Sequence, residues 1–423
     1  MKRLFAIFTL AFVVMGTKGY VEVGTTEQDS TWQSLAAPSP LTAEEEALPI
    51  VEELARRYNP AMAFVNEDIW PTPVSYIWHD GSHLIARVLN RAGRVVSEHI
   101  ALANDRLSSK AWADLPHEDE AGNSVEYWVA APGDDRLVGG LSGWIHRWRD
   151  IMGDASVYEQ DITLAEYPPT QYAHLYWHNR ERGLLGIQYW FYYPFNEWIN
   201  HHEGDWEHIN VILQGPTALT PDAEFEVVGH QFFFHQWVYE PSEVIRLASE
   251  SDPRNDHVMV YTGGHGRFLG WKGSYSGGSY PLPAVYRGAG GGVGLFRPTE
   301  DTSQTKRFIA ASDFDVVVLP EPERLDADAH PELSWLRLPF FAGQPSLFRN
   351  PFLVNLVDSD APPPQPGVRD DWNAMEAPSH WPYEDAIRRK PIELPDGWQR
   401  IDSNALKSPD ALVARQYPPE ERR

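Results

Sequence analysis

The sequence predicts a mainly β protein, an antiparallel β-sandwich of jelly-roll-like type with a few peripheral helices and long loops. Short runs rich in Val, Ile, Tyr, Phe and Trp alternate with turn-forming residues, which is typical of such sandwiches. These runs cover residues 84–89, 188–193, 206–213, 225–228, 231–239, 258–261 and 315–319. Helical periodicity is confined to residues 42–58, 141–152 and 242–249.

The first 19 residues have the features of a signal peptide. Lys2 and Arg3 precede an apolar run over residues 4–15, and small and polar residues at 16–19 end it. The run is short for a bilayer span, although an uncleaved anchor or a buried first strand is the alternative. We therefore expect an exported protein, secreted or periplasmic, with no transmembrane span in the rest of the chain.

The rest of the chain divides into segments of different amino-acid composition. Residues 20–45 are polar, and a helix follows over 42–58, with Thr42 as its cap and Glu45 three positions later. A proline-rich run at residues 361–366 starts a segment that we expect to wrap around the body. The predicted organisation is a signal peptide at 1–19, a flexible leader at 20–45, a β-sandwich domain at 46–360 and a Pro-rich strap with C-terminal tail at 361–423.

Composition excludes several classes of function. The chain has 60 acidic and 35 basic residues and a formal net charge of −25, which disfavours nucleic acids and anionic membranes as partners. It contains no cysteine, so disulfides, thiolate nucleophiles, Cys-ligated zinc and iron–sulfur clusters are excluded. An acidic surface concentrates cations, which suits a metal site.

The motif that carries chemistry lies within residues 186–213. If the chain is a strand from residue 205, Asp205 and Glu207 share one face and repel each other unless a cation lies between them. His202 can add a nitrogen ligand and Asn196 a carbonyl oxygen. The predicted metal ligands are therefore Asn196, His202, Asp205 and Glu207, and this mixed set does not distinguish Mg, Ca, Mn and Zn.

Other interpretations of the same residues stay open. The two carboxylates could pair with arginines on a neighbouring strand, and His201, His202 and His208 could be ordinary loop histidines. Glu203 and His265 are the candidates for proton transfer in a catalytic site. The Gly-Gly-His-Gly run around His265 could equally be a tight turn, and His235 fits a half-buried position in a strand.

Three stretches resemble the family of vacuolar protein sorting-associated protein 62, a group of β-rich proteins. Together they frame roughly residues 50–300. The stretches are Leu-Ala-Arg-Arg-Tyr-Asn-Pro at 54–60 with Pro-Thr-Pro-Val at 71–74, Tyr-Trp-Phe-Tyr-Tyr-Pro-Phe-Asn at 189–196 with His-Glu-Gly-Asp-Trp-Glu at 202–207, and Val-Tyr-Thr-Gly-Gly-His-Gly at 260–266 with Gly-Gly-Ser-Tyr-Pro at 277–281.

The second stretch is also similar, more distantly, to the necrosis- and ethylene-inducing peptide-like proteins, whose signature is Gly-His-Arg-His-Asp-Trp-Glu. Matching on Asp-Trp-Glu places His202, Asp205 and Glu207 on that family's metal ligands, and Asn196 near its fourth ligand, an Asp. The resemblance implies a β-sandwich with a divalent cation at the rim, where that family meets glycosylated sphingolipid head groups. Gly204 replaces the second His of the signature, Asn196 is neutral and the intervening loop is shorter, so toxin activity is not implied.

The sequence thus predicts an exported β-sandwich that uses a divalent metal to bind a glycosylated or anionic head group, on a glycolipid or glycan. A metal-dependent hydrolase of phosphoesters or glycans is one alternative. A structural or trafficking-related protein without catalysis is the other. The sequence contains no Gly-x-Ser-x-Gly nucleophile elbow, which favours a non-enzymatic function.

Overall fold

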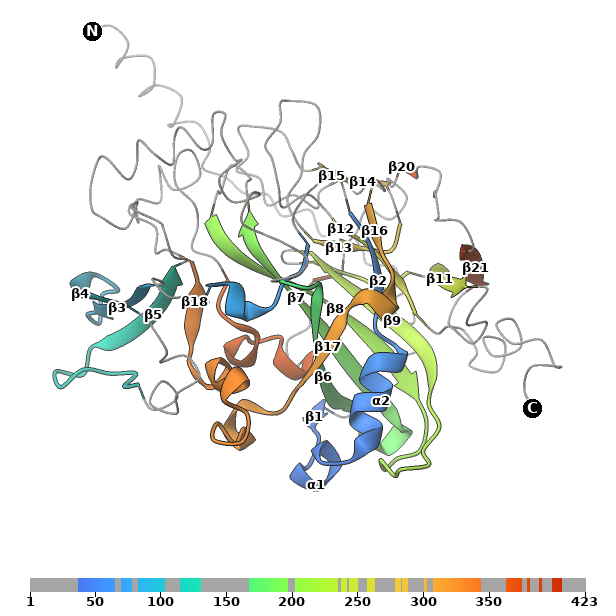
Figure 1. The fold of residues 1–423 in the computed structure, drawn as a ribbon, viewed down its shortest axis with the longest axis horizontal. Helices are drawn as coiled ribbons and strands as arrows, with labels where there is room; N and C mark the ends of the chain where they lie inside the picture. The colour runs from blue at the N-terminus through green and yellow to red at the C-terminus, as the bar shows by residue number, and fades with distance from the viewer. Residues whose placement is uncertain are drawn as a thin grey trace, which may run out of the picture. The chain divides into compact units, whose positions relative to one another are not determined.

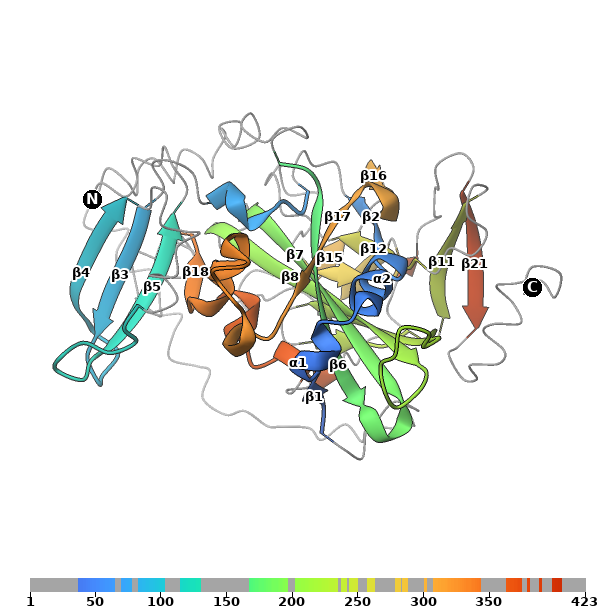
Figure 2. The same cartoon turned by 60° about the horizontal axis from the view of Figure 1, so that its bottom comes forward.

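An eight-stranded sheet built on two long antiparallel strands organises the fold (Figures 1 and 2). These strands are β7 (Leu184–Asn196) and β8 (His202–Gln214). The computed structural model describes residues 37–64, 70–77, 83–102, 115–130, 167–196, 202–234, 237–241, 243–249, 257–262, 278–282, 284–287, 300–302, 307–343, 363–374, 379–380, 388–389 and 398–404. All of them belong to one unit of the chain, Ser34–Arg423.

The strands of the central sheet run in the order β1-β6-β7-β8-β9-β10-β19, and β17 pairs with β6. The pairs from β1 to β10 are antiparallel, whereas β17 and β19 are added in parallel. The bounds of the other strands are β1 Ser39–Pro40, β6 Thr170–Asn179, β9 Glu226–Phe234, β10 Trp237–Tyr239, β17 Asp315–Leu319 and β19 Ser379–His380.

Smaller sheets complete the β structure. One has the order β13-β12-β2-β16 and another β18-β5-β3-β4, while β11 pairs with β21, and β14 lies between β15 and β20. Their bounds are β2 Ala61–Phe64, β3 His83–Leu89, β4 Val95–Leu102, β5 Ser124–Ala130, β11 Glu243–Ser249, β12 Met259–Thr262, β13 Ser279–Tyr280, β14 Ala284–Arg287, β15 Glu300–Thr302, β16 Arg307–Ile309, β18 Phe340–Ala342, β20 Arg388–Arg389 and β21 Trp398–Asn404.

A buried cluster joins the central sheet to the β2–β12 sheet. Phe234 and Tyr239 from β9 and β10 pack with Met259, Tyr261 and Tyr280 from β12 and β13. Two layers of strands therefore share one core, because each layer buries an apolar face against the other. The prediction of a mainly β fold with antiparallel sheets and few helices is confirmed.

The predicted helix over residues 42–58 forms as two helices, α1 (Ala43–Glu46) and α2 (Pro49–Arg57). The capping box at Thr42 is present, with the Glu45 amide donating to Thr42 Oγ1 over 3.2 Å and Glu45 Oε2 accepting from the Thr42 amide over 2.9 Å. Pro49 has no amide hydrogen to continue the first helix, so it starts a second one instead. The domain boundary predicted at residue 46 falls within α1, and Ser39–Pro40 of the predicted leader pair with β6.

The helix expected over residues 242–249 is wrong. Residues Glu243–Ser249 form β11, which pairs with β21 along its whole length. The run Val-Ile-Arg-Leu is compatible with either structure, and a partner strand from the far end of the chain decides it. The helix predicted over 141–152 lies outside the described residues. Among the described helices, none has the length and apolar character needed to cross a membrane.

A row of polar side chains crosses the interior of the central sheet. The strand register places His174 opposite Gln188, Gln188 opposite Asn210 and Asn210 opposite Gln231. The first three of these residues are at most 1% exposed. Buried polar groups need hydrogen-bond partners, and part of this need is met by another segment of the chain.

That segment, residues 363–374, is here called the C-terminal strap. It contains the short 3₁₀ turns η7 (Pro366–Val368) and η8 (Trp372–Ala374). Gln188 Nε2 donates to the Asp371 carbonyl over 2.8 Å, and the Asn373 amide donates to Gln188 Oε1 over 3.1 Å. Asn373 Oδ1 also lies 2.7 Å from His174 Nε2, so the strap supplies partners for two residues of the polar row, His174 and Gln188.

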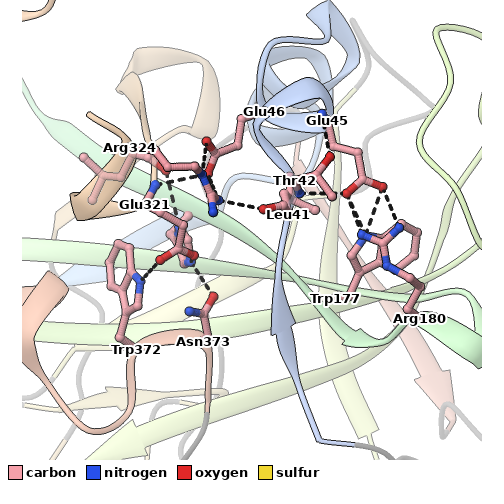
Figure 3. A network of polar contacts seen from close by, with 12 residues as sticks. Leu41, Thr42, Glu45, Glu46, Trp177, Arg180, Glu321, Arg324, Trp372 and Asn373 are labelled. Carbon is pink, nitrogen blue, oxygen red and sulfur yellow. Dashed lines mark hydrogen bonds and ion pairs between the residues drawn. The ribbon is translucent and has the colours of Figure 1, made fainter. Parts of the chain in front are cut away.

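Contacts of Trp372, a residue of the strap, with His174 and Glu321 fix the position of the strap; Figure 3 shows the contact with Glu321. The Trp372 indole stacks on His174 with ring centroids 3.8 Å apart, and its Nε1 donates to Glu321 Oε2 over 3.0 Å. Burial by itself would raise the pKa of Glu321, but hydrogen bonds from His174, Trp372 and Asn373 lower it to about 2. The carboxylate is therefore charged at any physiological pH and holds its donors in place.

Removing the Trp372 side chain is expected to destabilise the fold strongly. Trp372→Ala deletes the ring stack, the bond to Glu321 and a residue that is 7% exposed, so the free energy of unfolding should fall by about 3–5 kcal/mol. Urea unfolding measures this loss. The matched control is Val368→Ala in the same strap, because Val368 is 43% exposed and its truncation should change stability by only about 0.5 kcal/mol. Equal effects of the two substitutions would contradict the proposed anchoring.

Candidate metal centre on the central hairpin

The strands β7 and β8 form a hairpin that carries the four predicted metal ligands. Their register pairs Asn196 with His202 at the hairpin end and places Asp205 opposite Tyr193. The side chains of Asn196, His202 and Glu203 lie outside the described ones, and His265 and His235 lie outside the described residues. The structure therefore places the backbone of all four predicted ligands on two adjacent strands, and the side chains of two of them.

Asp205 and Glu207 behave as the sequence pattern predicts. The predicted strand over residues 205–213 is part of β8, so successive side chains alternate between the faces of the sheet. Asp205 is 8% exposed and its Oδ1 accepts a hydrogen bond from the Trp206 amide over 2.9 Å, while Glu207 is half-buried. Two carboxylates thus share one face of β8 in a partly buried setting.

Gly204, just before this pair, has a structural role that the sequence did not reveal. Its φ is +66°, and a Cβ atom at this position would lie 1.9 Å from the carbonyl oxygen of Ala342 in β18. A side chain is thus excluded both by backbone conformation and by the close approach of β18. A glycine is therefore needed at this position of β8.

His208 lies on the opposite face of β8 and is not available as a ligand. Its ring stacks between Trp190 on β7 and Phe233 on β9, with centroid distances of 4.1 and 4.0 Å. Burial lowers the pKa of His208 to about 3, against the opposing influence of Asp371. The residue is therefore neutral at physiological pH, as part of an aromatic stack.

Arg369 of the C-terminal strap is the residue that sequence reasoning missed. Its guanidinium lies over the Trp190 ring, 5.2 Å from the centroid, and binds Asp371 through two contacts of 2.9 Å. Burial would lower the pKa of Arg369, but the charges of Asp371, Glu207 and Asp205 raise it. Asp205 and Glu207 thus act on an arginine of the strap through their charge, whereas the alternative interpretation expected them to pair with arginines on a neighbouring strand.

Two of the predicted metal ligands, Asp205 and Glu207, have described side chains. Carboxylate oxygens such as those of Asp205 and Glu207 suit hard cations. Among the residues whose side chains are described, no group of three or more His, Asp and Glu is arranged to hold a metal ion. The predicted site therefore requires Asn196 and His202 to complete the set.

Comparison of the chain with models of known protein families, with curated proteins and with solved structures gives no match. The resemblances drawn from the sequence motifs remain predictions.

Replacing Gly204 is expected to disrupt the hairpin. Gly204→Ala combines a left-handed backbone with a clash against Ala342, so stability should fall by about 2–4 kcal/mol. Gly93→Ala is the matched control, because Gly93 has φ +69° and nothing lies within 4 Å of the place its Cβ would take, and it should cost only about 1–2 kcal/mol. Thermal or urea unfolding of the two variants separates the clash from the backbone strain. A smaller loss for Gly204→Ala than for Gly93→Ala would disprove the close approach of β18.

The buried His208 predicts a pH dependence of stability. As pH falls below about 6.5, the unfolded chain binds a proton at this residue, whereas the folded chain does so only near pH 3. The free energy of unfolding should therefore fall with decreasing pH, with a contribution from His208 of up to about 1.4 kcal/mol per pH unit. Urea unfolding between about pH 6 and pH 5 should show a shallower slope for His208→Phe, which keeps a ring in the stack. The exposed His330→Phe serves as control, and equal slopes in all three proteins would rule out this assignment.

Proposed function

We propose that this chain is a non-catalytic binding protein that holds a divalent cation at the end of the β7–β8 hairpin. The cation would be coordinated by Asp205 and Glu207 with Asn196 and His202, and it would bind an anionic or glycosylated head group of a glycolipid or glycan. The predicted signal peptide places this function outside the cytoplasm, in a secreted or periplasmic protein. The motif resemblance supports the same ligand class.

One observation carries the proposal, namely that two carboxylates share one face of β8 where the strand is partly buried. Asp205 is 8% exposed and Glu207 is half-buried, so water screens their mutual repulsion only in part. Both carboxylates also act on the buried Arg369, whose guanidinium binds Asp371 through two contacts. A divalent cation at Asp205 and Glu207 would stabilise the negative charge of the pair.

The position of Asp205 and Glu207 suits a cation that also contacts an external ligand, rather than a cation enclosed by the protein. Glu207 is half-buried while Asp205 is 8% exposed, so the pair lies between the core and the surface. A cation held there by protein ligands on one side can keep coordination positions open on the other. Hydroxyl or phosphate oxygens of a head group are suitable ligands for those open positions.

Metal binding is tested by thermal melting of the purified protein with and without EDTA. A bound ligand stabilises by RT ln(1 + [L]/Kd), about 2.7 kcal/mol at one hundred times Kd, so EDTA should lower the melting temperature of the wild type. The variant Asp205→Asn/Glu207→Gln should melt at the same temperature with and without EDTA. The control is Glu118→Gln/Glu120→Gln, an exposed carboxylate pair with the same spacing, which should keep the EDTA effect.

If the wild type and the Asp205→Asn/Glu207→Gln variant respond equally to EDTA and to added Ca²⁺, Mg²⁺, Mn²⁺ and Zn²⁺, the proposed site is wrong. If the wild type alone responds, the same variants are then compared for binding to vesicles that contain glycosylated or anionic lipids. Binding that needs both the metal and the acidic pair would support the proposed ligand class.

A further inference from the structure

His174 of β6 has a hydrogen-bond acceptor opposite each of its two ring nitrogens. Its Nδ1 lies 3.3 Å from the carbonyl oxygen of Leu319 on β17, the strand that pairs with β6 at this position. Its Nε2 lies 2.7 Å from Asn373 Oδ1 on the C-terminal strap and 3.3 Å from Glu321 Oε1. The residue is 1% exposed, so these contacts, rather than water, determine which ring nitrogens carry a proton.

The side-chain amide of Asn373 has one favourable orientation here. Its nitrogen donates to the Glu321 carboxylate, so its oxygen faces the ring of His174 (Figure 3). The reverse orientation would turn the amide oxygen towards a carboxylate, and two acceptors would then face each other. A neutral imidazole has one N–H group and one acceptor nitrogen, whereas an imidazolium donates from both nitrogens. The acceptors around His174 therefore match its doubly protonated form.

We propose that His174 is an imidazolium that clamps the C-terminal strap to the central sheet, and that the strap loosens as this proton is lost above neutral pH. The strap would thus be a pH-sensitive part of the fold. This inference concerns the protein alone and does not rest on the proposed cation site.

The surroundings of His174 supply one compensating charge. Among the residues that the structure describes, the charged group that faces the ring is the Glu321 carboxylate, from the segment that follows β17. Tyr176 lies on the same strand with its ring centroid 6.3 Å away, and it is neutral because burial raises its pKa. Gln188 from β7 and Trp372 from the strap also face the ring, and neither of them titrates.

Loss of the proton would remove a charge and a donor together. Each neutral tautomer of His174 places a lone pair against an acceptor, either the Leu319 carbonyl or the oxygens of Asn373 and Glu321. It also leaves the Glu321 carboxylate, which is 5% exposed, without the positive charge beside it. A buried charge that loses its partner destabilises the groups arranged around it.

The strap depends on this carboxylate. Glu321 Oε2 accepts a hydrogen bond from Trp372 Nε1 over 3.0 Å, so the same ion pair holds a second residue of the strap (Figure 3). Arg324 also acts on Glu321, but its guanidinium is already bound to Glu46 through contacts of 3.0 and 2.6 Å. The imidazolium of His174 is therefore the charge whose loss the strap would feel most directly.

Proton linkage gives the direction of the pH effect. The folded chain holds a proton at His174 that the unfolded chain releases above about pH 6.5. The stabilisation is complete below that pH and is lost as the pH rises, so the unfolding equilibrium constant should rise by up to about tenfold per pH unit. His208 adds no slope in this range, because it is neutral in the folded chain and, above about pH 7.5, in the unfolded chain as well.

Hydrogen exchange of the strap amides tests the clamp. The amides of Trp372 and Asn373 donate to the Arg369 carbonyl and to Gln188 Oε1, so they report whether the strap is seated. After correction for the intrinsic exchange rate, both should exchange at least about threefold faster at about pH 9 than at about pH 7, while amides of the β7–β8 ladder keep their protection. Strap protection that does not change with pH would overturn the proposal.

Two substitutions separate the proton from packing. His174→Gln and Glu321→Gln each remove one charge of the pair and keep a polar side chain. Both should loosen the strap already at neutral pH and abolish its response to pH. His330→Gln is the control, because its side chain is 59% exposed, and it should keep the wild-type response. A wild-type response in His174→Gln or in Glu321→Gln contradicts the clamp, and either variant decides if the other does not fold.

Nitrogen NMR of protein labelled at histidine tests the protonation state itself. At neutral pH the wild type should contain a histidine with both ring nitrogens protonated, and His174→Gln should lack this signal. In Glu321→Gln the same ring should be neutral at that pH. A wild-type His174 with a single protonated nitrogen would rule out the imidazolium, whatever the strap does.

Discussion

The buried polar row across the central sheet is the constraint on which the rest of this structure depends. His174, Gln188 and Asn210 lie side by side on neighbouring strands and are almost completely buried. Such groups destabilise a core unless they find partners. The C-terminal strap supplies partners for His174 and Gln188 through Asp371 and Asn373, and Asn210 donates to Gln231. A segment near the end of the chain is thereby required to complete the core formed by its middle.

This constraint also separates the two faces of β8. An aromatic stack and the strap cover the face that carries His208. His208 is therefore buried and neutral, and its role is structural. The other face carries Asp205 and Glu207, whose charges contribute to the raised pKa of Arg369 in the strap. The strap therefore covers the face that carries His208, and the candidate site lies on the other face.

Local patterns predicted the strands well, because a run of alternating or β-branched residues is a property of neighbours in sequence. The run at 315–319 is β17 itself, and residues 188–193 and 206–213 lie within β7 and β8. The spacing of Asp205 and Glu207 likewise predicted their common face. What sequence could not show depends on distant contacts: β11 needs its partner β21, Gly204 needs the approach of β18, and Arg369 needs the docked strap. The Pro-rich run before Arg369 indicated a strap but not what it would touch.

The central claim is that the acidic pair of β8 holds a cation at the end of the β7–β8 hairpin. The most direct measurement is anomalous diffraction from crystals of the protein grown or soaked with Mn²⁺. The account predicts an anomalous peak within coordination distance, about 2.1–2.3 Å, of carboxylate oxygens of both Asp205 and Glu207. A map without a peak there, with the two carboxylates bound instead to basic side chains, would contradict it.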